Sequence, residues 1–216
     1  MKVAIQQPHF LPWPGYWHKL LTADRFLLWD AVGFAKGEYI NRIRHDGAWL
    51  TLPVSASLNE PIRQVKLTTD ARALRKVAVT VMHTQGKYRS RLDRVVEKLR
   101  KIEPGSSMNL LNITLLQEVM WTLVPKGPEL LVVGEIGAGE TKTNRLLDVL
   151  TTHAPEMTTY LTGIGALDYL DKEAFGGIPI WWQNIAGFDP EQSILTLIAQ
   201  EPDPYDRIMS MGGWKC

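Results

Sequence analysis

The chain has 216 residues, 45% of them hydrophobic, which is enough to bury a core within one domain spanning residues 1–216. Its 24 Lys and Arg residues balance 23 Asp and Glu residues, and the net charge of +1 excludes a general attraction to nucleic acid or to anionic membranes. The single cysteine, Cys216, excludes an intrachain disulfide and a cysteine-based zinc site. No apolar run reaches the roughly 18 residues of a membrane helix. We therefore expect a cytoplasmic protein with no membrane partner.

The chain opens with a pattern typical of a strand, a loop and a helix. Residues 2–6 predict a short buried strand, prolines and glycine interrupt it across residues 8–15, and the apolar residues 16–21 favour a helix. Residues 25–30 predict a second strand that ends on Asp30. This order places the first loop at the carboxyl end of a strand.

The middle of the chain predicts a hairpin and a group of helices. Residues 39–54 alternate in polarity around Asp46 and Gly47, and Asp-Gly is a strong turn signal in hairpins. Residues 63–67 favour one more short strand. Periodic apolar residues then predict three helices, over residues 70–83, 87–102 and 109–123.

The last part of the chain alternates strands and helices. The continuously apolar residues 129–134 predict a central strand, and a helix is expected to begin at Thr141 or Thr143. Further elements are predicted over residues 158–161 (strand), 168–175 (helix), 178–182 (an edge strand, since it contains proline) and 193–199 (helix). This alternation favours an α/β fold with a mainly parallel sheet covered on both faces, plus an antiparallel hairpin insertion.

The first loop is a candidate anion-binding site. Gln6, Gln7 and His9 follow the first strand, and ligands of open α/β sheets bind outside the carboxyl ends of strands. The amides at the start of the following helix would attract phosphate. In the alternative interpretation, the prolines and Gly15 only shape a tight turn and His9 is an ordinary loop residue.

A second candidate cluster follows the second strand. Asp30, Lys36 and Asn41 lie close in sequence to Arg42 and Arg44, which alternate onto one strand face and could hold a phosphate bidentately. Asp30 is a candidate base for an attacking amine or, alternatively, a turn cap. The cluster is equally typical of a solvated hairpin face.

Two further segments have competing interpretations. The basic helix over residues 87–101 could follow a nucleic-acid backbone, but such runs are commonly solvated helix faces with paired charges. Residues 134–139 are rich in glycine but lack the GxGxxG spacing, which excludes nicotinamide binding and favours a flexible loop leading to the Thr141 helix. Gly163 and Gly165 favour relief of backbone crowding, with Tyr169 either in the core or on a pocket wall.

Several separated motifs resemble the WbqC-like protein family in the order expected. They are residues 6–16 (QQPHFLPWPGY), 23–26 (ADRF), 29–34 (WDAVGF), 41–44 (NRIR), 49–54 (WLTLPV), 142–147 (KTNRLL) and 160–170 (YLTGIGALDYL). The resemblance implies a single WbqC-like domain of a family known from bacterial O-antigen gene clusters and from phage genomes. It also implies a link to transfer of amino acids such as glycine onto activated acceptors, including pyrophosphorylated hydroxymethyluracil in thymidine hypermodification of bacteriophage DNA. A phage-encoded member would work in the host cytoplasm.

A second, weaker resemblance is to the HxGH nucleotidylyltransferases. The strand, proline-containing loop and helix at the start, and the basic helix start at residues 141–145, are similar to theirs and imply a Rossmann-like three-layer sandwich. Trp13 and Tyr16 stand where that motif places its two histidines. This departure argues against nucleotidyl transfer but leaves a pyrophosphate site in place.

These features lead to the hypothesis of a transferase that needs no cofactor and no metal. A small amine, such as glycine, would displace (pyro)phosphate from a phosphorylated acceptor, such as 5-(pyro)phosphomethyl-deoxyuridine in phage DNA. The alternative is an enzyme of O-antigen biosynthesis that modifies a nucleotide-linked sugar and binds its diphosphate at the same anion site. A non-catalytic module that binds a modified base or sugar is the third possibility. The candidate catalytic residues are His9, Asp30 and Lys36. The candidate binding residues are Gln6, Gln7, Trp13, Tyr16, Asn41, Arg42, Arg44, Thr141, Lys142, Thr143, Arg145, Gly163 and Tyr169.

Overall fold

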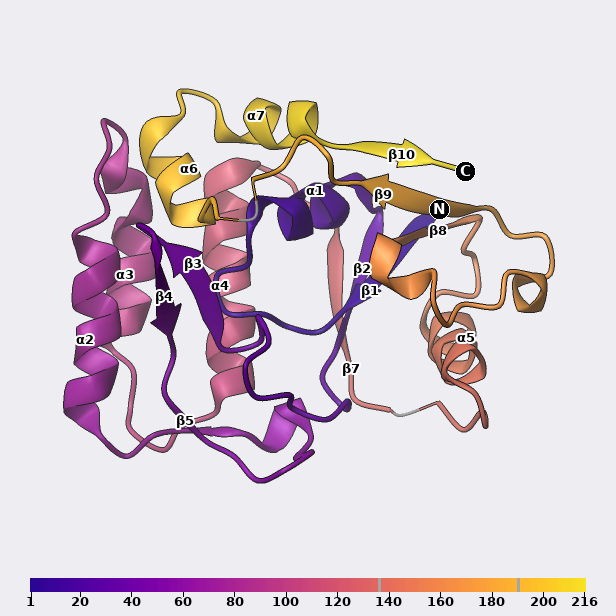
Figure 1. The fold of residues 1–216 in the computed structure, drawn as a ribbon, viewed down its shortest axis with the longest axis horizontal. Helices are drawn as coiled ribbons and strands as arrows, with labels where there is room; N and C mark the ends of the chain where they lie inside the picture. Colours follow the sequence, from indigo (N-terminus) through magenta and orange to yellow (C-terminus); the bar gives the residue numbers. More distant parts are fainter. Residues whose placement is uncertain (136, 190) are drawn as a thin grey trace.

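A six-stranded sheet forms the centre of the molecule in a computed structural model that describes residues 1–135, 137–189 and 191–216 (Figure 1). The strand order is β10-β9-β8-β1-β2-β7. β10 runs antiparallel to β9 and the other neighbours pair in parallel, so the predicted mainly parallel sheet is confirmed. The strands are β1 (Lys2–Gln6), β2 (Arg25–Trp29), β7 (Glu129–Val133), β8 (Thr159–Thr162), β9 (Ile180–Asn184) and β10 (Gly213–Lys215).

Helices cover both faces of this sheet. Successive side chains of a strand point to opposite faces, so the apolar strands need a cover on each face. Ala4 of β1 packs in a core with α1 and α4, whereas its neighbours Val3 and Ile5 pack in a second core with α5. In Figure 1, α5 accordingly lies on one side of the sheet, and α1 and α4 lie on the other. These helices are α1 (Pro14–Thr22), α4 (Met108–Leu123) and α5 (Lys142–His153).

The insertion between β2 and α4 contains the predicted antiparallel hairpin. Its strands β3 (Arg42–His45) and β4 (Ala48–Thr51) are joined by Asp46 and Gly47, both with positive φ, as a tight primed turn requires. The remaining elements of the insertion are β5 (Val54–Ser55), β6 (Lys66–Leu67), α2 (Ala71–Met82) and α3 (Asp93–Arg100), with short 3-10 turns at Ile62–Gln64 and Arg89–Leu92. The helix expected over residues 87–102 therefore begins as a 3-10 turn.

Two expected strand positions are wrong. β7, predicted to be central, lies at the sheet edge, and its Val132 is 44% exposed. The strand expected at an edge is β9, which lies between β8 and β10. Pro179 does not disturb the sheet because it precedes β9 and contributes its carbonyl, which accepts from the Tyr160 amide at 2.9 Å.

The end of the chain also differs from expectation. The helix predicted over residues 168–175 is absent from the described structure, where only 3-10 turns form at Ile164–Ala166 and Glu173–Phe175. Beyond α6 (Ile194–Gln200), the sequence analysis missed α7 (Pro204–Met211) and β10. None of the described helices is long and apolar enough to cross a membrane.

The strand order creates a crevice beside β1. The chain leaves β1 toward β2 on one side, whereas β8 pairs with β1 on the other side. Loops that leave the carboxyl ends of β1 and β8 therefore separate in opposite directions. Ligands of open α/β sheets bind at such a switch point.

Candidate functional site

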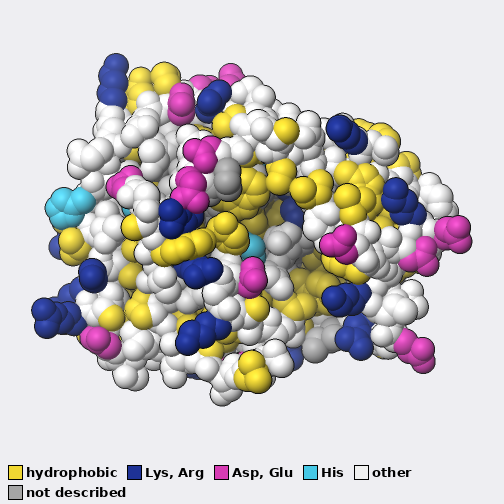
Figure 2. Space-filling view, in the orientation of Figure 1, with side chains coloured by type: hydrophobic (Ala, Val, Ile, Leu, Met, Phe, Trp, Pro, Cys, Tyr) yellow, Lys and Arg dark blue, Asp and Glu magenta, His cyan; other side chains and the backbone are white. Residues whose placement is uncertain are grey.

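A cavity of about 650 Å³ opens at the carboxyl ends of β1, β2 and β8, at this switch point. Figure 2 shows this face of the molecule hollowed near its centre, with hydrophobic side chains exposed in the hollow. Three aromatic side chains line the cavity: Trp29, Tyr160 and Tyr169. The polar side chains that line it are Gln6, Gln7, Lys19, Lys142, Arg145 and Thr162. Among the described lining residues there is no Asp, Glu or His.

The amino end of α5 borders the cavity with two cations. Thr141 caps the helix by accepting from the Asn144 amide at 3.1 Å, as predicted for a helix start. Lys142 and Arg145 are three residues apart on this first turn, so both reach the cavity. The Lys142 ammonium lies 5.4 Å from the centre of the Tyr169 ring. The free amides of the helix start reinforce the positive potential of this wall.

Lys19 was missed by the sequence analysis. It comes from α1, is only 6% exposed, and donates to the side-chain oxygen of Gln6. Burial lowers the pKa of Lys19 to about 8, because its charged form is poorly solvated there. A signal for it existed, since Lys19 is the charged residue within the apolar run from Tyr16 to Leu21.

His9 lies next to the cavity but not among its lining residues. Its side chain is buried, its Nδ1 has no hydrogen-bond partner among the described residues, and its ring centre is 5.3 Å from that of Tyr16. Burial, reinforced by the positive charge of Lys19, lowers the pKa of His9 to about 3. The imidazole is therefore neutral at physiological pH and is a weak base.

Asp30 lies between two lining residues, Trp29 and Ala31, but its carboxylate turns toward α4. There it accepts from Asn109 at 2.6 Å, while its Oδ1 is buried without a partner in the described structure. Burial raises the pKa of Asp30 above its usual range, against the opposing effects of Asn109 and Arg63. This carboxylate is therefore a stronger base than an ordinary aspartate.

The residues predicted to form the second cluster occupy a different part of the molecule. Arg42 donates to the Gly37 carbonyl and stacks 3.9 Å from the Trp49 ring centre, and Arg44 pairs with Glu191. Asn41 is buried and donates to the carbonyl of Leu52 at 2.9 Å. None of the three lines the cavity.

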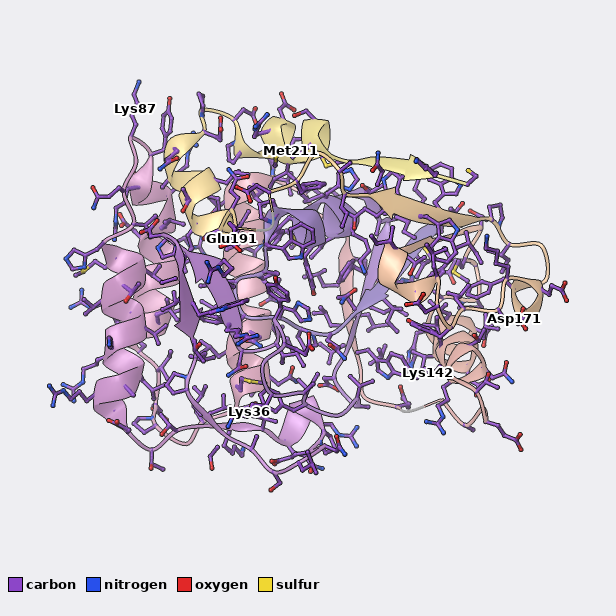
Figure 3. The ribbon with its side chains drawn as sticks, viewed as in Figure 1. Lys36, Lys87, Lys142, Asp171, Glu191 and Met211 are labelled. Carbon is purple, nitrogen blue, oxygen red and sulfur yellow. The ribbon has the colours of Figure 1, made fainter. Side chains whose placement is uncertain are left out.

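Lys36 is exposed on the connection that leads to the hairpin. Figure 3 shows it on the side of the molecule that carries the hairpin and α4, whereas Lys142 lies beside α5. It is also absent from the lining of the cavity. A direct role of Lys36 in a reaction at the cavity therefore finds no support in its position.

Three other predicted binding residues have structural contacts. Tyr16 is buried in the core and donates from its hydroxyl to the Gln7 carbonyl at 3.0 Å. Trp13 packs edge-on against Phe188. Thr143 is buried and holds the segment near Tyr169, donating to that residue's carbonyl at 3.0 Å. The contacts of Tyr16 and Thr143 position two lining residues, Gln7 and Tyr169, whereas Trp13 is not among the lining residues.

The structure thus brings together six of the predicted residues: Gln6, Gln7, Lys142, Arg145, Gly163 and Tyr169. It adds Trp29 to these, together with Lys19 and Thr162, which were not predicted from the sequence. The fold brings these residues together. They lie at the carboxyl ends of strands of one sheet, or they face this edge from α1 and α5.

The glycine-rich segment after β7 packs closely on the start of α5. A Cβ on Gly137 would collide with the Arg145 carbonyl, and one on Gly139 would collide with Asn144. Arg145 in turn donates from Nε to the Gly139 carbonyl at 2.8 Å. The glycines are required for this close approach rather than for binding a dinucleotide. Ile136, within the loop expected to be flexible, lies outside the described residues.

Cations of the basic region at residues 87–101 are paired with groups from other parts of the protein. Glu118 is 2% exposed and contacts Arg94 at 2.7 Å and Lys98 at 3.3 Å. Arg91 donates to the carbonyls of residues 201 and 202. Such pairing is typical of a structural helix face and leaves fewer cations for a nucleic-acid backbone.

The comparisons with known proteins agree with the motifs. The chain is 25% identical over 225 residues to uncharacterized protein Rv1507c of Mycobacterium tuberculosis. The aligned region covers 94% of this chain and 96% of that protein. No solved structure matches the chain. The WbqC-like protein family matches residues 7–196, which include the first loop, α5 and the residues lining the cavity from Gln7 onward. The chain therefore belongs to the WbqC-like protein family.

Proposed function

We propose that this protein is a transferase that binds a phosphoryl- or pyrophosphoryl-activated acceptor in the cavity and joins a small amine to it. The observation that carries the proposal is the pair of cations, Lys142 and Arg145, at the start of α5 beside a cavity at the switch point. Cations and free helix amides bind and stabilise phosphate oxygens. The strand order β7-β2-β1-β8-β9-β10 reverses direction at β1, and the cavity lies at this switch point, which supports a bound ligand at this place.

The proposed reaction is a displacement at the carbon that bears the phosphate. The neutral amine nitrogen attacks this carbon, a C–N bond forms, and the C–O bond breaks. The leaving group takes the bonding electrons: a nucleoside diphosphate from a nucleotide-linked sugar, or (pyro)phosphate from a (pyro)phosphorylated base. Lys142 and Arg145 neutralise the charge that develops on the leaving group. One proton of the attacking nitrogen passes to the Asp30 carboxylate, whose raised pKa suits a base; this step requires the carboxylate to turn from Asn109 toward the cavity.

A nucleotide-linked sugar is the acceptor that the geometry favours. The cavity volume lies in the range of sites for single small molecules, and Trp29 and Tyr169 offer aromatic faces to a base or a sugar. The association of the family with O-antigen biosynthesis supports the same class. A pyrophosphorylated hydroxymethyluracil base in DNA, with glycine as amine, is the second candidate, because it presents the same leaving group and a base that aromatics can stack.

The test is a matrix of acceptors and amines followed by mass analysis of the products. Nucleotide-linked sugars and pyrophosphorylated hydroxymethyluracil DNA are each incubated with glycine and a full panel of amino acids. We expect one acceptor to gain the amine and lose its leaving group, which is the nucleoside diphosphate of the nucleotide-linked sugar or the pyrophosphate of the modified base. Binding of an acceptor without conversion by any amine would contradict the transferase and support a binding module.

Arg145→Ala and Lys142→Ala are each expected to lower kcat/KM by roughly 10- to 100-fold, since a charged hydrogen bond to phosphate contributes about 1.5–3 kcal/mol. The matched controls are Arg72→Ala and Lys76→Ala, which remove exposed cations from α2. Equal effects of the site and control substitutions would show that net charge, rather than the α5 wall, governs the activity.

Asp30→Asn is expected to lower kcat by about 100-fold or more while leaving KM for the acceptor nearly unchanged, because loss of a base affects the chemical step. The amide keeps the size of the side chain, and circular dichroism checks that the fold is retained. Full activity of Asp30→Asn at neutral pH would exclude Asp30 as the base.

A further inference from the structure

Lys19 has an environment that the fold alone does not explain. Its ammonium is buried beside the cavity, and among the described residues it forms no ion pair. Its hydrogen bond is to the neutral amide of Gln6. A buried charge without a counter-ion destabilises a protein, and such a group is commonly retained where a ligand supplies the missing charge.

The groups that face Lys19 are neutral or positive. His9 carries no charge at neutral pH because burial lowers its pKa to about 3. Tyr160, on β8 across the cavity, stays protonated because burial raises its pKa. Lys142 and Arg145 line the same cavity from α5. The described lining therefore provides positive charge and leaves the negative charge to the ligand.

We infer that Lys19, held by Gln6, forms an inner oxyanion subsite that is separate from the Lys142 and Arg145 wall. This inference deepens the proposed function, on whose phosphorylated acceptor it rests. Lys19 comes from α1 on one face of the sheet, whereas Lys142 and Arg145 come from α5 on the other. A ligand that satisfies both places carries an anionic group at each of them.

Two sources of the inner oxyanion fit this chemistry. One is the second phosphate of a pyrophosphoryl-activated acceptor, and the other is the carboxylate of an amino-acid donor. Both present oxygens that accept hydrogen bonds from an ammonium. The subsite is therefore specific for oxyanions, and separate titrations of each compound identify the source.

The experiment measures binding of inorganic pyrophosphate, inorganic phosphate and glycine to the full chain by calorimetry and by the shift in Tm. The variants are Lys19→Met, which removes the charge, and Lys19→Arg, which keeps it. Lys66→Met, at an exposed lysine of β6, is the matched control. We expect Lys19→Met to weaken binding of the preferred anion at least 10-fold, and Lys19→Arg and Lys66→Met to retain it.

Two additional readouts separate a ligand role from a structural one. Without ligand, Lys19→Met is expected to raise Tm, because it removes an uncompensated buried charge. Binding to the wild type is expected to weaken above pH 8, where Lys19 loses its proton, whereas Lys19→Arg should bind equally well from pH 7 to pH 9. Bound anion raises the pKa of Lys19, so binding takes up protons in this range.

Wild-type affinity in Lys19→Met, or a lower Tm with unchanged affinity, would overturn the subsite and assign Lys19 a structural role. If Lys19→Met does not fold, Lys19→Gln in the same titrations decides the question. Loss of anion binding in Lys19→Met together with failure of every transfer assay would refute the transferase but retain the subsite. Transfer activity in the wild type together with unchanged anion binding in Lys19→Met would retain the transferase but refute the subsite.

Discussion

Acidification from pH 7 to about pH 4.5 is expected to lower the free energy of unfolding by roughly 5 kcal/mol, because two buried histidines resist protonation. Burial lowers the pKa of His9 to about 3 and that of His18 to about 4, from an ordinary value of 6.5. The unfolded chain therefore binds two protons that the folded chain does not. Their stabilising contribution is present above pH 6.5 and is lost as the pH falls toward the folded-state pKa values.

Two other groups modify this profile. Burial also lowers the pKa of His45, which acts in the same direction, whereas the raised pKa of Asp30 acts in the opposite one. Because total stability of a domain is commonly about 5–15 kcal/mol, the loss is large enough to unfold much of the protein near pH 4.5. Urea unfolding at a series of pH values measures it directly.

Variants identify the groups responsible for the acid sensitivity. His18→Asn and His9→Asn should each flatten the dependence of the unfolding free energy on pH between about 4.5 and 6.5. His83→Asn removes an exposed histidine and should leave the slope of the wild type. A wild-type slope in the double variant of His9 and His18 would refute the assignment.

Asn112→Leu is expected to destabilise the protein by about 3 kcal/mol and to disturb the cavity, although it does not touch a ligand. The fully buried Asn112 amide of α4 donates to the carbonyls of Pro8 and Ile40 at 3.0 and 2.9 Å. These bonds fasten the first loop to the connection between β2 and β3. Leucine has a similar volume but leaves the Pro8 carbonyl without a donor in a dry environment, and the Ile40 carbonyl keeps only the bond from the Phe10 amide at 3.0 Å.

Chemical unfolding and anion binding test this prediction together. Asn112→Leu should lower the unfolding free energy and weaken binding of pyrophosphate, since Gln7 precedes the loop that Asn112 holds. Gln117→Leu, a polar-to-apolar change at a half-buried position of the same helix, should have a smaller effect on both. Equal stability of Asn112→Leu and the wild type would show that solvent satisfies the Pro8 carbonyl.

Much of the local structure could be predicted from the sequence because its determinants are local. The Asp46-Gly47 turn specifies the β3–β4 hairpin, Thr141 caps α5, and short continuous apolar runs mark β1 and β2. The motifs of the first loop and of α5 were sufficient to identify the family. The position of Lys142 and Arg145 at the start of α5 could be predicted from the same local rules.

Long-range pairing decided which of these residues share a site. Residues 129–134 contain an edge strand and residues 178–182 contain part of an interior one, but neither segment contains a signal for its position. Strand order depends on partners far away in the sequence. For the same reason, the sequence could not show that Arg42 and Arg44 lie outside the cavity. A hairpin inserted after β2 can fold away from the sheet edge.

The sequence by itself therefore determined the family and the α/β class, and it predicted an anion-binding segment at residues 141–145. Only the tertiary structure decided that Lys19 shares one cavity with Lys142 and Arg145. The physical reason is that α1 and α5 reach this cavity from opposite faces of the sheet, with more than a hundred residues between them. Burial of a charge depends on packing, which no local pattern specifies.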